Sequence, residues 1–180
     1  MKEKRYAMAV DTRVCVGCNA CVLACKSEND LPERGFRDWV VTETTGTFPH
    51  LSQEIRSERC NHCVKSPCVS ACPTGASHLN EGGAVIVDRR KCTGCKACIA
   101  SCPYGARYVD PRGFVDKCTF CLHRVRRGIE PACADICPTR ALVFGDLNDP
   151  QSEISSVLRA RKYKTLKPEA GLDPQVYFLL

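Results

Sequence analysis

Sixteen cysteines stand in four groups of four along this chain of 180 residues. The first and third groups have the spacing C-x2-C-x2-C-x3-C, the second C-x2-C-x4-C-x3-C and the fourth C-x2-C-x11-C-x3-C. Pro73, Pro103 and Pro138 follow three of the four last cysteines. Thiolate runs of this kind hold [4Fe–4S] clusters, so the pattern predicts four of them. In chain order the groups are Cys15, Cys18, Cys21, Cys25; Cys60, Cys63, Cys68, Cys72; Cys92, Cys95, Cys98, Cys102; and Cys118, Cys121, Cys133, Cys137.

The spacing suits a cubane because each of its four irons needs one thiolate. Two residues between ligands let a tight loop bring three cysteines to three irons, while the last cysteine points toward a neighbouring cluster. Gly17 and Gly94 stand inside two of these loops, where we expect left-handed turns that glycine adopts freely. We also expect backbone N–H groups of the loops to donate to the sulfurs and to set the potentials.

Two other uses of paired cysteines fit less well. A structural zinc site takes four ligands, usually two separated pairs, whereas C-x2-C-x2-C occurs here twice. A disulfide scaffold suits a small secreted domain, but the N-terminus lacks the apolar core of a secretory signal. Cluster ligands must stay reduced until iron is inserted, so we expect assembly in a reducing cytoplasm.

The charge balance argues for clusters rather than for nucleic acid. The formal net charge is +6 with cysteine neutral. Sixteen thiolates add −16 and four oxidised cluster cores about +8, which brings the loaded chain to about −2. Aromatic residues are only 7% of the chain, so the clusters replace part of the core and the apo chain should fold poorly. No run of about 18 apolar residues is present, so we expect no direct membrane span.

Internal repetition predicts an α+β fold of two ferredoxin-like modules, each holding two [4Fe–4S] clusters. The repeated segments CPTGA, CPYGA and CPTRA each lead into a short apolar stretch. Residues 77–79 and 84–87 flank a turn and predict one hairpin, and residues 107–109 and 114–115 predict another. We expect residues 1–180 to form a single compact unit in which the modules interleave. One module combines the first and fourth cysteine groups, the other the second and third.

Two segments stand outside the repeats. Residues 26–59 are an insertion, in which 39–44 and 51–56 predict a β-hairpin that caps the body or meets a partner. Residues 146–180 predict a C-terminal helix and an extended docking tail. Asp149 and Pro150 are expected to begin the helix, and Ile154, Val157, Leu158 and Arg161 are expected to give it an amphipathic face. The apolar end, 176–180, packs on its own body or docks on another subunit.

The sequence resembles the four-cluster iron–sulfur subunits of molybdopterin respiratory oxidoreductases over nearly its whole length. The resemblance rests on the four cysteine groups, on the long spacer inside the fourth and on the segments CTFCLHR, PAC, CPT and FGDLNDP. It is strongest toward the iron–sulfur subunits of polysulfide and thiosulfate reductases, and those of dimethyl sulfoxide and arsenate reductases are similar. Lys26 departs from the pattern, since it replaces the proline after the last cysteine of the first group.

The resemblance implies that each last cysteine serves the cluster of another group. All sixteen ligand positions are cysteine, so it implies four [4Fe–4S] clusters and no three-iron cluster. The implied ligand sets are set I, Cys15, Cys18, Cys21 and Cys137; set II, Cys25, Cys118, Cys121 and Cys133; set III, Cys60, Cys63, Cys68 and Cys102; and set IV, Cys72, Cys92, Cys95 and Cys98.

The resemblance also implies a role and partners. Such a subunit is not itself catalytic: it relays electrons between a quinol-interacting integral membrane subunit and a molybdopterin catalytic subunit of a respiratory reductase, here for a sulfur compound. The implied location is peripheral on the cytoplasmic membrane, on the periplasmic face if the chain is exported together with a catalytic subunit that bears a twin-arginine signal. A cytoplasmic location is the alternative.

Two other function classes compete with this interpretation. A free-standing soluble polyferredoxin would carry electrons between enzymes, but it has little need of an insertion and an apolar tail. An enzyme with its own open iron site would lack a cysteine ligand, and none is missing. His62 and His123 lie beside cysteines and are expected to hydrogen-bond to sulfur or to pack rather than to ligate iron. The basic residues 124, 126 and 127 form either a solvated face or a docking patch.

Overall fold

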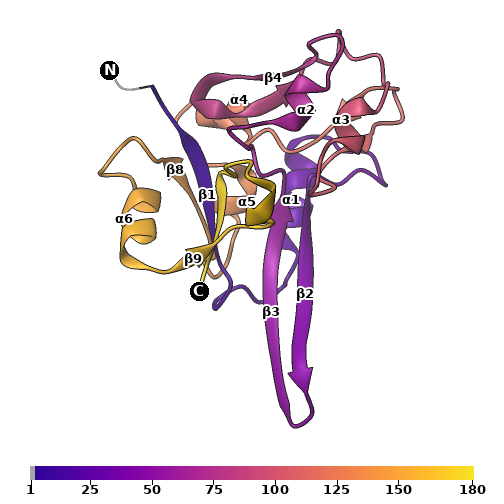
Figure 1. Cartoon of the computed structure of the whole chain (residues 1–180). Helices are drawn as coiled ribbons and strands as arrows, with labels where there is room; N and C mark the ends of the chain where they lie inside the picture. Colours follow the sequence, from indigo (N-terminus) through magenta and orange to yellow (C-terminus); the bar gives the residue numbers. More distant parts are fainter. Residues whose placement is uncertain (1–2) are drawn as a thin grey trace.

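A computed structural model describes residues 3–180 of the chain as an α+β arrangement of short helices and small sheets (Figure 1). The helices are α1 (Ala20–Glu28), α2 (Pro67–Ser70), α3 (Ala97–Ala100), α4 (Leu122–Val125), α5 (Ala132–Asp135) and α6 (Glu153–Ala160), with 3-10 turns at Glu81–Gly83 and Pro168–Ala170. The strands are β1 (Tyr6–Asp11), β2 (Asp38–Thr47), β3 (His50–Arg59), β4 (Ser77–Leu79), β5 (Val85–Val87), β6 (Tyr108–Val109), β7 (Val115–Asp116), β8 (Leu142–Asp146), β9 (Tyr163–Lys164) and β10 (Val176–Leu179).

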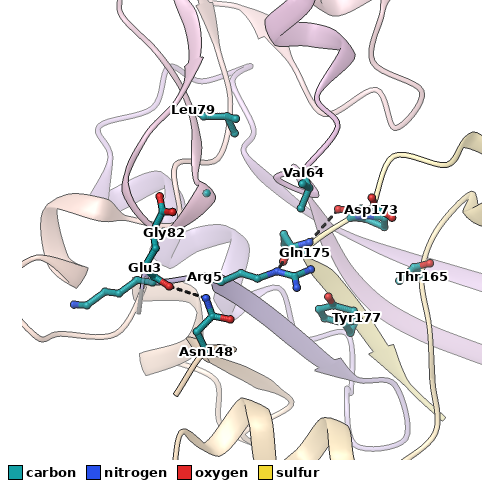
Figure 2. A pocket seen from close by; sticks show the side chains of 13 residues that line it. Glu3, Arg5, Val64, Leu79, Gly82, Asn148, Thr165, Asp173, Gln175 and Tyr177 are labelled. Atoms are coloured by element: carbon teal, nitrogen blue, oxygen red, sulfur yellow. Dashed lines mark hydrogen bonds between the residues drawn. The ribbon is translucent and has the colours of Figure 1, made fainter. Parts of the chain in front are cut away.

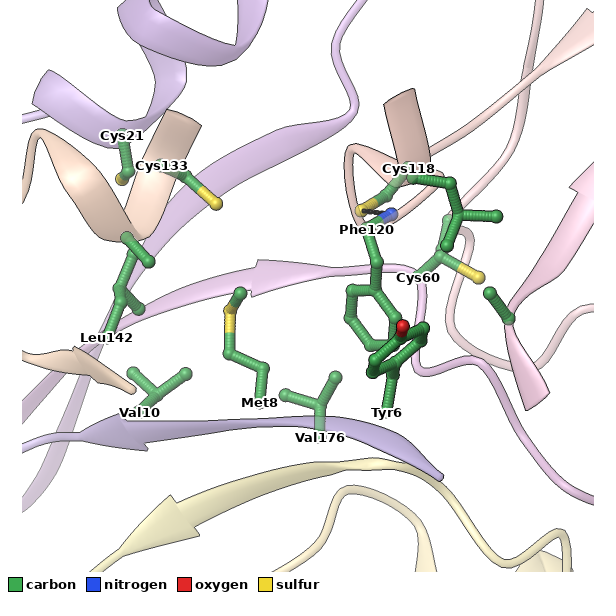
Figure 3. Packing of buried hydrophobic residues seen from close by; sticks show 14 of the residues in the cluster. Tyr6, Met8, Val10, Cys21, Cys60, Cys118, Phe120, Cys133, Leu142 and Val176 are labelled. Atoms are coloured by element: carbon green, nitrogen blue, oxygen red, sulfur yellow. Dashed lines mark hydrogen bonds between the residues drawn. The ribbon is translucent and has the colours of Figure 1, made fainter. Parts of the chain in front are cut away.

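A four-stranded sheet joins the two ends of the chain. Its order is β8-β1-β10-β9, with β1 parallel to β10 and antiparallel to β8. Alternate side chains of β1 point to opposite faces, as in any strand. Tyr6, Met8 and Val10 face the cysteine-rich core (Figure 3), while Ala7 and Ala9 pack with Ile154 of α6. The sheet thus separates the cysteines from the C-terminal helix.

The three expected hairpins are confirmed. The insertion forms β2 and β3, which pair in register from Asp38 opposite Arg59 to Thr47 opposite His50. This hairpin is longer than expected at both ends and projects from the body (Figure 1). β4 pairs with β5, and β6 pairs with β7, after the second and third cysteine groups. The repeated cysteine segment and the hairpin behind it therefore form a recurring unit.

The C-terminal helix is present, but its expected start was wrong. Helix α6 begins at Glu153 and its N-cap is Ser152, whose Oγ accepts a hydrogen bond from Ser155 N–H at 3.3 Å. The Asp149 carboxylate instead closes a turn by accepting from Gln151 N–H at 2.9 Å. Ile154 is fully buried and Val157 and Leu158 pack beside it, as expected. Arg161 was wrongly placed on that face, because it ends the helix and forms an ion pair with Asp11.

The apolar tail packs on its own body as β10. Val176, Phe178 and Leu179 are buried, and β10 runs beside β1 with Met8 opposite Val176. Their side chains are therefore occupied within this chain, and the docking role of the tail stays a prediction. None of the helices within residues 3–180 is long and apolar enough to cross a membrane.

Candidate metal centres

The same backbone turn recurs in all four cysteine loops. The residue before the second cysteine of each group lies in the left-handed region, with φ of 67° at Gly17, 43° at His62, 69° at Gly94 and 52° at Phe120. Such a turn reverses the chain within a few residues, which brings neighbouring thiols onto one side of the loop. The expected glycine turns are confirmed, and the two loops without glycine use the same conformation.

A helix follows each loop; α1, α2 and α3 carry further cysteines, whereas the next cysteine of the fourth group lies on α5 and not on α4. Helix α1 holds Cys21 and Cys25 and packs against α5, which holds Cys133; α2 and α3 hold Cys68 and Cys98 and also pack together. Helices α2, α3 and α5 are only four residues long, and each ends shortly before a Cys-Pro pair. Proline disfavours the helical conformation of the residue before it, which stops these helices.

Lys26, the departure from the proline pattern, has a structural reason. Without proline, α1 continues for nine residues to Glu28. The Lys26 Nζ then donates to the carbonyls of Pro32, Glu33 and Gly35, each at 2.9 Å. Lysine here fixes the start of the insertion that leads into β2.

Three cavities of similar size are each lined by four cysteines. Their empty volumes are about 340, 320 and 290 Å³. Each cavity combines three cysteines of one group with a single cysteine from another group. The cysteines lining them are, respectively, Cys15, Cys18, Cys21 and Cys137; Cys25, Cys118, Cys121 and Cys133; and Cys72, Cys92, Cys95 and Cys98.

The remaining four cysteines also gather at one place. Burial, together with the charges of Cys60, Cys68 and Cys102, raises the pKa of the Cys63 thiol to about 12. Those interactions require the four sulfurs to be near neighbours. Residues 3–180 contain no three His, Cys, Asp or Glu side chains that converge as the ligands of one metal ion do.

The four cysteine sets follow one another in space. Cys21 and Cys25 on α1 connect the first two sets through one helix, while Cys68 and Cys72 connect the last two around α2. Cys118 connects the second and third sets, since burial and the charge of Cys60 are among the causes that raise the pKa of its thiol to about 12. Exposed cysteines within residues 3–180 occur only in the two outer sets, at Cys18 and Cys95.

The polar groups around the sulfurs fit the binding of anionic clusters. Backbone N–H groups of Ser77, Val115 and Phe120 donate to the sulfurs of Cys72, Cys92 and Cys118 at 3.3 to 3.4 Å, as expected for cluster loops.

Buried arginine N–H groups without hydrogen-bond acceptors also support the binding of anionic clusters. Within residues 3–180, the buried Nε of Arg59 and the buried Nε and Nη1 of Arg107 find no hydrogen-bond acceptor. A buried donor is normally satisfied, and the sulfides of a cluster between the thiolates would accept from it. The residues present therefore fit [4Fe–4S] clusters, which would supply one-electron chemistry when bound.

Neither histidine beside the cysteines takes a ligand position. His62 is fully buried, its ring stacks on Phe120 with centroids 3.7 Å apart, and its Nδ1 accepts from Val85 N–H at 3.0 Å. His123 pairs with Glu28 at 2.6 Å. The packing interpretation therefore holds for His62, whereas His123 contacts a carboxylate instead of a sulfur.

The basic patch is partly neutralised within the chain. Arg124 pairs with Glu28 and Asp135, and Arg126 pairs with Glu81. Arg124 and Arg126 therefore form ion pairs within the chain, while Arg127 donates to the backbone carbonyl of His123.

A wider cavity of about 640 Å³ lies at the surface and is lined by no cysteine. Arg5 and Gln175 form part of its wall and join through a hydrogen bond of 2.7 Å, while Asn148 donates to the Glu3 carbonyl (Figure 2). Val64, which follows Cys63, lines the same cavity. This groove lies beside a cysteine loop but is separate from the cysteine-lined cavities.

Sequence reasoning missed the buried cations among the sulfurs. Arg59, Arg107 and Lys117 are buried, and the sequence signals only that Arg59 and Lys117 directly precede a cysteine. Lys91 shares that position and is exposed. A basic residue directly before a cysteine could therefore have drawn attention to Arg59 and Lys117, but it does not show whether such a residue is buried or exposed.

Comparison with known families places the cysteines in a defined domain type. Two matches to 4Fe-4S dicluster domains cover residues 7–73 and 51–147. Together they account for all four groups, and two dicluster domains hold four [4Fe–4S] clusters in total.

Related proteins match over nearly the full length of the sequence. A polysulfide reductase polypeptide of Wolinella succinogenes is 44% identical over 98% of this chain and 94% of that protein. A tetrathionate reductase polypeptide of Salmonella typhimurium is 40% identical over 97% of this chain and 72% of that protein. The arsenate respiratory reductase iron–sulfur subunit of a Shewanella species is 35% identical over 97% of this chain and 96% of that protein.

The dicluster domains, the cysteine sets gathered in space and the length of the similarity agree with one another. They also agree with a protein that binds clusters and carries no catalytic site of its own. This protein belongs to the family of 4Fe-4S dicluster iron–sulfur subunits, the non-catalytic electron-transfer subunits of respiratory reductases.

Proposed function

We propose that this chain is an electron wire in which sets I to IV, as defined above, ligate one [4Fe–4S] cluster each. Three sets are supported by a common cavity, and set III by the mutual charge effects of its thiols. The modules expected from the repeats then consist of sets I and II, linked by α1 and α5, and sets III and IV, linked by α2 and α3.

One observation carries the proposal: among the described residues, exposed cysteines occur only in sets I and IV, which would be the two ends of a row. Cys18 in set I and Cys95 in set IV are the exposed positions. A relay needs buried inner sites, which exclude water, and accessible outer sites, which partners can approach.

The partners follow from this arrangement and from the family. We propose that one end receives electrons from a quinol-interacting membrane subunit and that the other passes them to a molybdopterin catalytic subunit. Two of the relatives are named for the reduction of polysulfide and tetrathionate, which supports a sulfur compound as the terminal substrate. The complex would hold the chain peripherally on the cytoplasmic membrane, on its periplasmic face.

The ligand sets are tested by pairs of cysteine substitutions. Cys25→Ser combined with Cys118→Ser changes two ligands of one set, so it should remove about four irons per chain. Cys25→Ser combined with Cys18→Ser is the matched control, which touches two sets and should remove about eight. Iron analysis after anaerobic reconstitution gives the answer. If the second pair loses only one cluster, Cys25 belongs with its own group and the crossed sets are wrong.

The partners are tested by anaerobic affinity purification of the tagged chain from native membranes in mild detergent. We expect a large subunit that contains molybdenum and a membrane protein with several spans, identified by mass spectrometry and metal analysis. An untagged strain is the control for carry-over. Recovery of a lone, soluble, iron-rich chain would instead favour a mobile polyferredoxin.

A further inference from the structure

Three buried cations lie among the sixteen sulfurs, one at each junction between neighbouring sets. The first is Arg59, whose side chain is 0% exposed and lies between sets I and II. Its Nη1 donates to Cys133 Sγ at 3.6 Å, and its charge acts on the thiols of Cys21, Cys118 and Cys133. Its Nη2 lies 3.1 Å from Asp38, so this cation has a carboxylate partner.

The second cation, Lys117, lies at the junction of sets II and III. The residue is 1% exposed. Its Nζ donates to the carbonyls of Val85 and Cys118. Burial lowers the pKa of its ammonium group, and the charges of Cys60, Cys118 and Cys68 oppose that shift. Val85 packs with Cys68 of set III, and Cys118 belongs to set II, so the ammonium group lies between the two inner sets.

The third cation, Arg107, lies at the junction of sets III and IV. Its Nη2 donates to Cys68 Sγ at 2.8 Å and to Ser77 Oγ at 2.9 Å. The charges of Cys68 and Cys60, in set III, and of Cys98, in set IV, act on it. Arg107 is buried, with two of its guanidinium nitrogens free of acceptors within residues 3–180.

Lys117 and Arg107 form no ion pair with any carboxylate of the described residues, unlike Arg59. A buried cation is rarely left unpaired, because its removal from water is costly. A cubane with four thiolates carries about two negative charges when oxidised and gains one more on reduction. Such clusters are the anions that these two side chains lack.

We propose that Arg59, Lys117 and Arg107 tune electron transfer, and that the positive charge of each raises the reduction potentials of the two clusters at its junction. The inference rests on the ligand sets proposed above. A fixed positive charge stabilises the added electron, and low-dielectric surroundings screen it weakly. Because Asp38 offsets the charge of Arg59, the effect is smallest at the junction of sets I and II. The clusters of sets II, III and IV are therefore easier to reduce than the cluster of set I.

The alternative is a purely structural role, in which each side chain ties loops together through carbonyl and hydroxyl contacts. The two roles differ in what a neutral substitution changes. A structural role predicts loss of stability or of iron without a change in potential. An electrostatic role predicts a change in potential confined to two clusters out of four.

Lys117→Met in the intact protein tests the central junction. Electron paramagnetic resonance during anaerobic redox titration measures the potentials, with each signal assigned by the cysteine variants above. We expect the clusters of sets II and III to become at least tenfold harder to reduce, which is 59 mV for one electron. The clusters of sets I and IV should stay unchanged, and Lys117→Arg should restore the original values.

Lys91→Met is the matched control, because Lys91 also directly precedes a cysteine but is exposed. Solvent screens its charge, so the potentials should hardly move. Equal shifts in the Lys91 and Lys117 variants, a uniform shift of all four clusters, or no shift with about sixteen irons retained would overturn the inference.

Two further variants decide the question if Lys117→Met fails to assemble. Arg107→Gln should make sets III and IV harder to reduce, whereas Asp38→Asn should make sets I and II easier to reduce, since it removes a negative charge. Shifts of the same sign in both variants would contradict an electrostatic cause. Fewer than four clusters in the unaltered protein would instead overturn the ligand sets, and this inference with them.

Discussion

The outer and inner cysteine loops share one backbone turn but fill it differently. The outer loops, which belong to sets I and IV, place Gly17 and Gly94 before the second cysteine, and Cys18 and Cys95 are exposed. The inner loops place His62 and Phe120 at the same position. Both of these rings are buried and stack on each other between sets II and III.

The difference shows that the same backbone turn can either leave a cysteine accessible to a partner or shield it from water. A residue other than glycine at positive φ costs roughly 1–3 kcal/mol, which glycine avoids. The inner loops accept that strain and bury two rings, which excludes water from the middle of the row. The outer loops keep the small residue and leave their second cysteine accessible to a partner.

Substitution of a cysteine should reveal the largest difference between the inner and outer loops. Cys118→Ser changes a buried cysteine of set II beside Phe120, so we expect loss of one cluster and a large drop in the yield of folded protein, because cluster binding supplies folding energy. Cys95→Ser, at an exposed outer position, should lose or convert one cluster and leave the rest folded. Iron content and thermal unfolding under anaerobic conditions measure both. Equal damage in the two variants would remove the distinction.

The ring stack should be the next largest contribution. Phe120→Ala removes a side chain that is 1% exposed and should cost about 3–5 kcal/mol of stability. Phe48→Ala at the hairpin tip is the control, since Phe48 is 89% exposed and its loss should change stability by less than about 0.5 kcal/mol. Denaturant unfolding of the reconstituted protein measures the difference. Comparable costs would mean that the stack does not stabilise the centre.

The two outer glycines should differ from each other by a smaller amount. A Cβ at Gly94 would lie 2.4 Å from the Gly113 carbonyl oxygen, whereas at Gly17 it would lie 3.1 Å from a methyl of Ile55. Both residues have a similar positive φ, so both alanine variants carry backbone strain of about 1–3 kcal/mol. Gly94→Ala adds a clash with backbone and should be the less stable variant. The same unfolding measurement applies, and the reverse order would contradict the steric argument.

Much of the fold was predictable because it is local. The hairpins after the second and third cysteine groups, the insertion hairpin and the glycine turns all follow from residues close together in the sequence. The four-stranded sheet was not predicted, since β1 and β10 pair across almost the whole chain. The helix start was misread because Asp149 and Ser152 both suit an N-cap, and the turn took the first of them.

The sequence by itself determined that this protein holds four clusters, because each cubane needs four thiolates and sixteen cysteines stand in four closely spaced groups. The tertiary structure alone decided which charges act on them. Arg59, Lys91 and Lys117 each directly precede the first cysteine of a group, yet only Lys91 is exposed. Burial depends on how distant loops pack, and burial sets whether solvent screens a charge or a cluster experiences it.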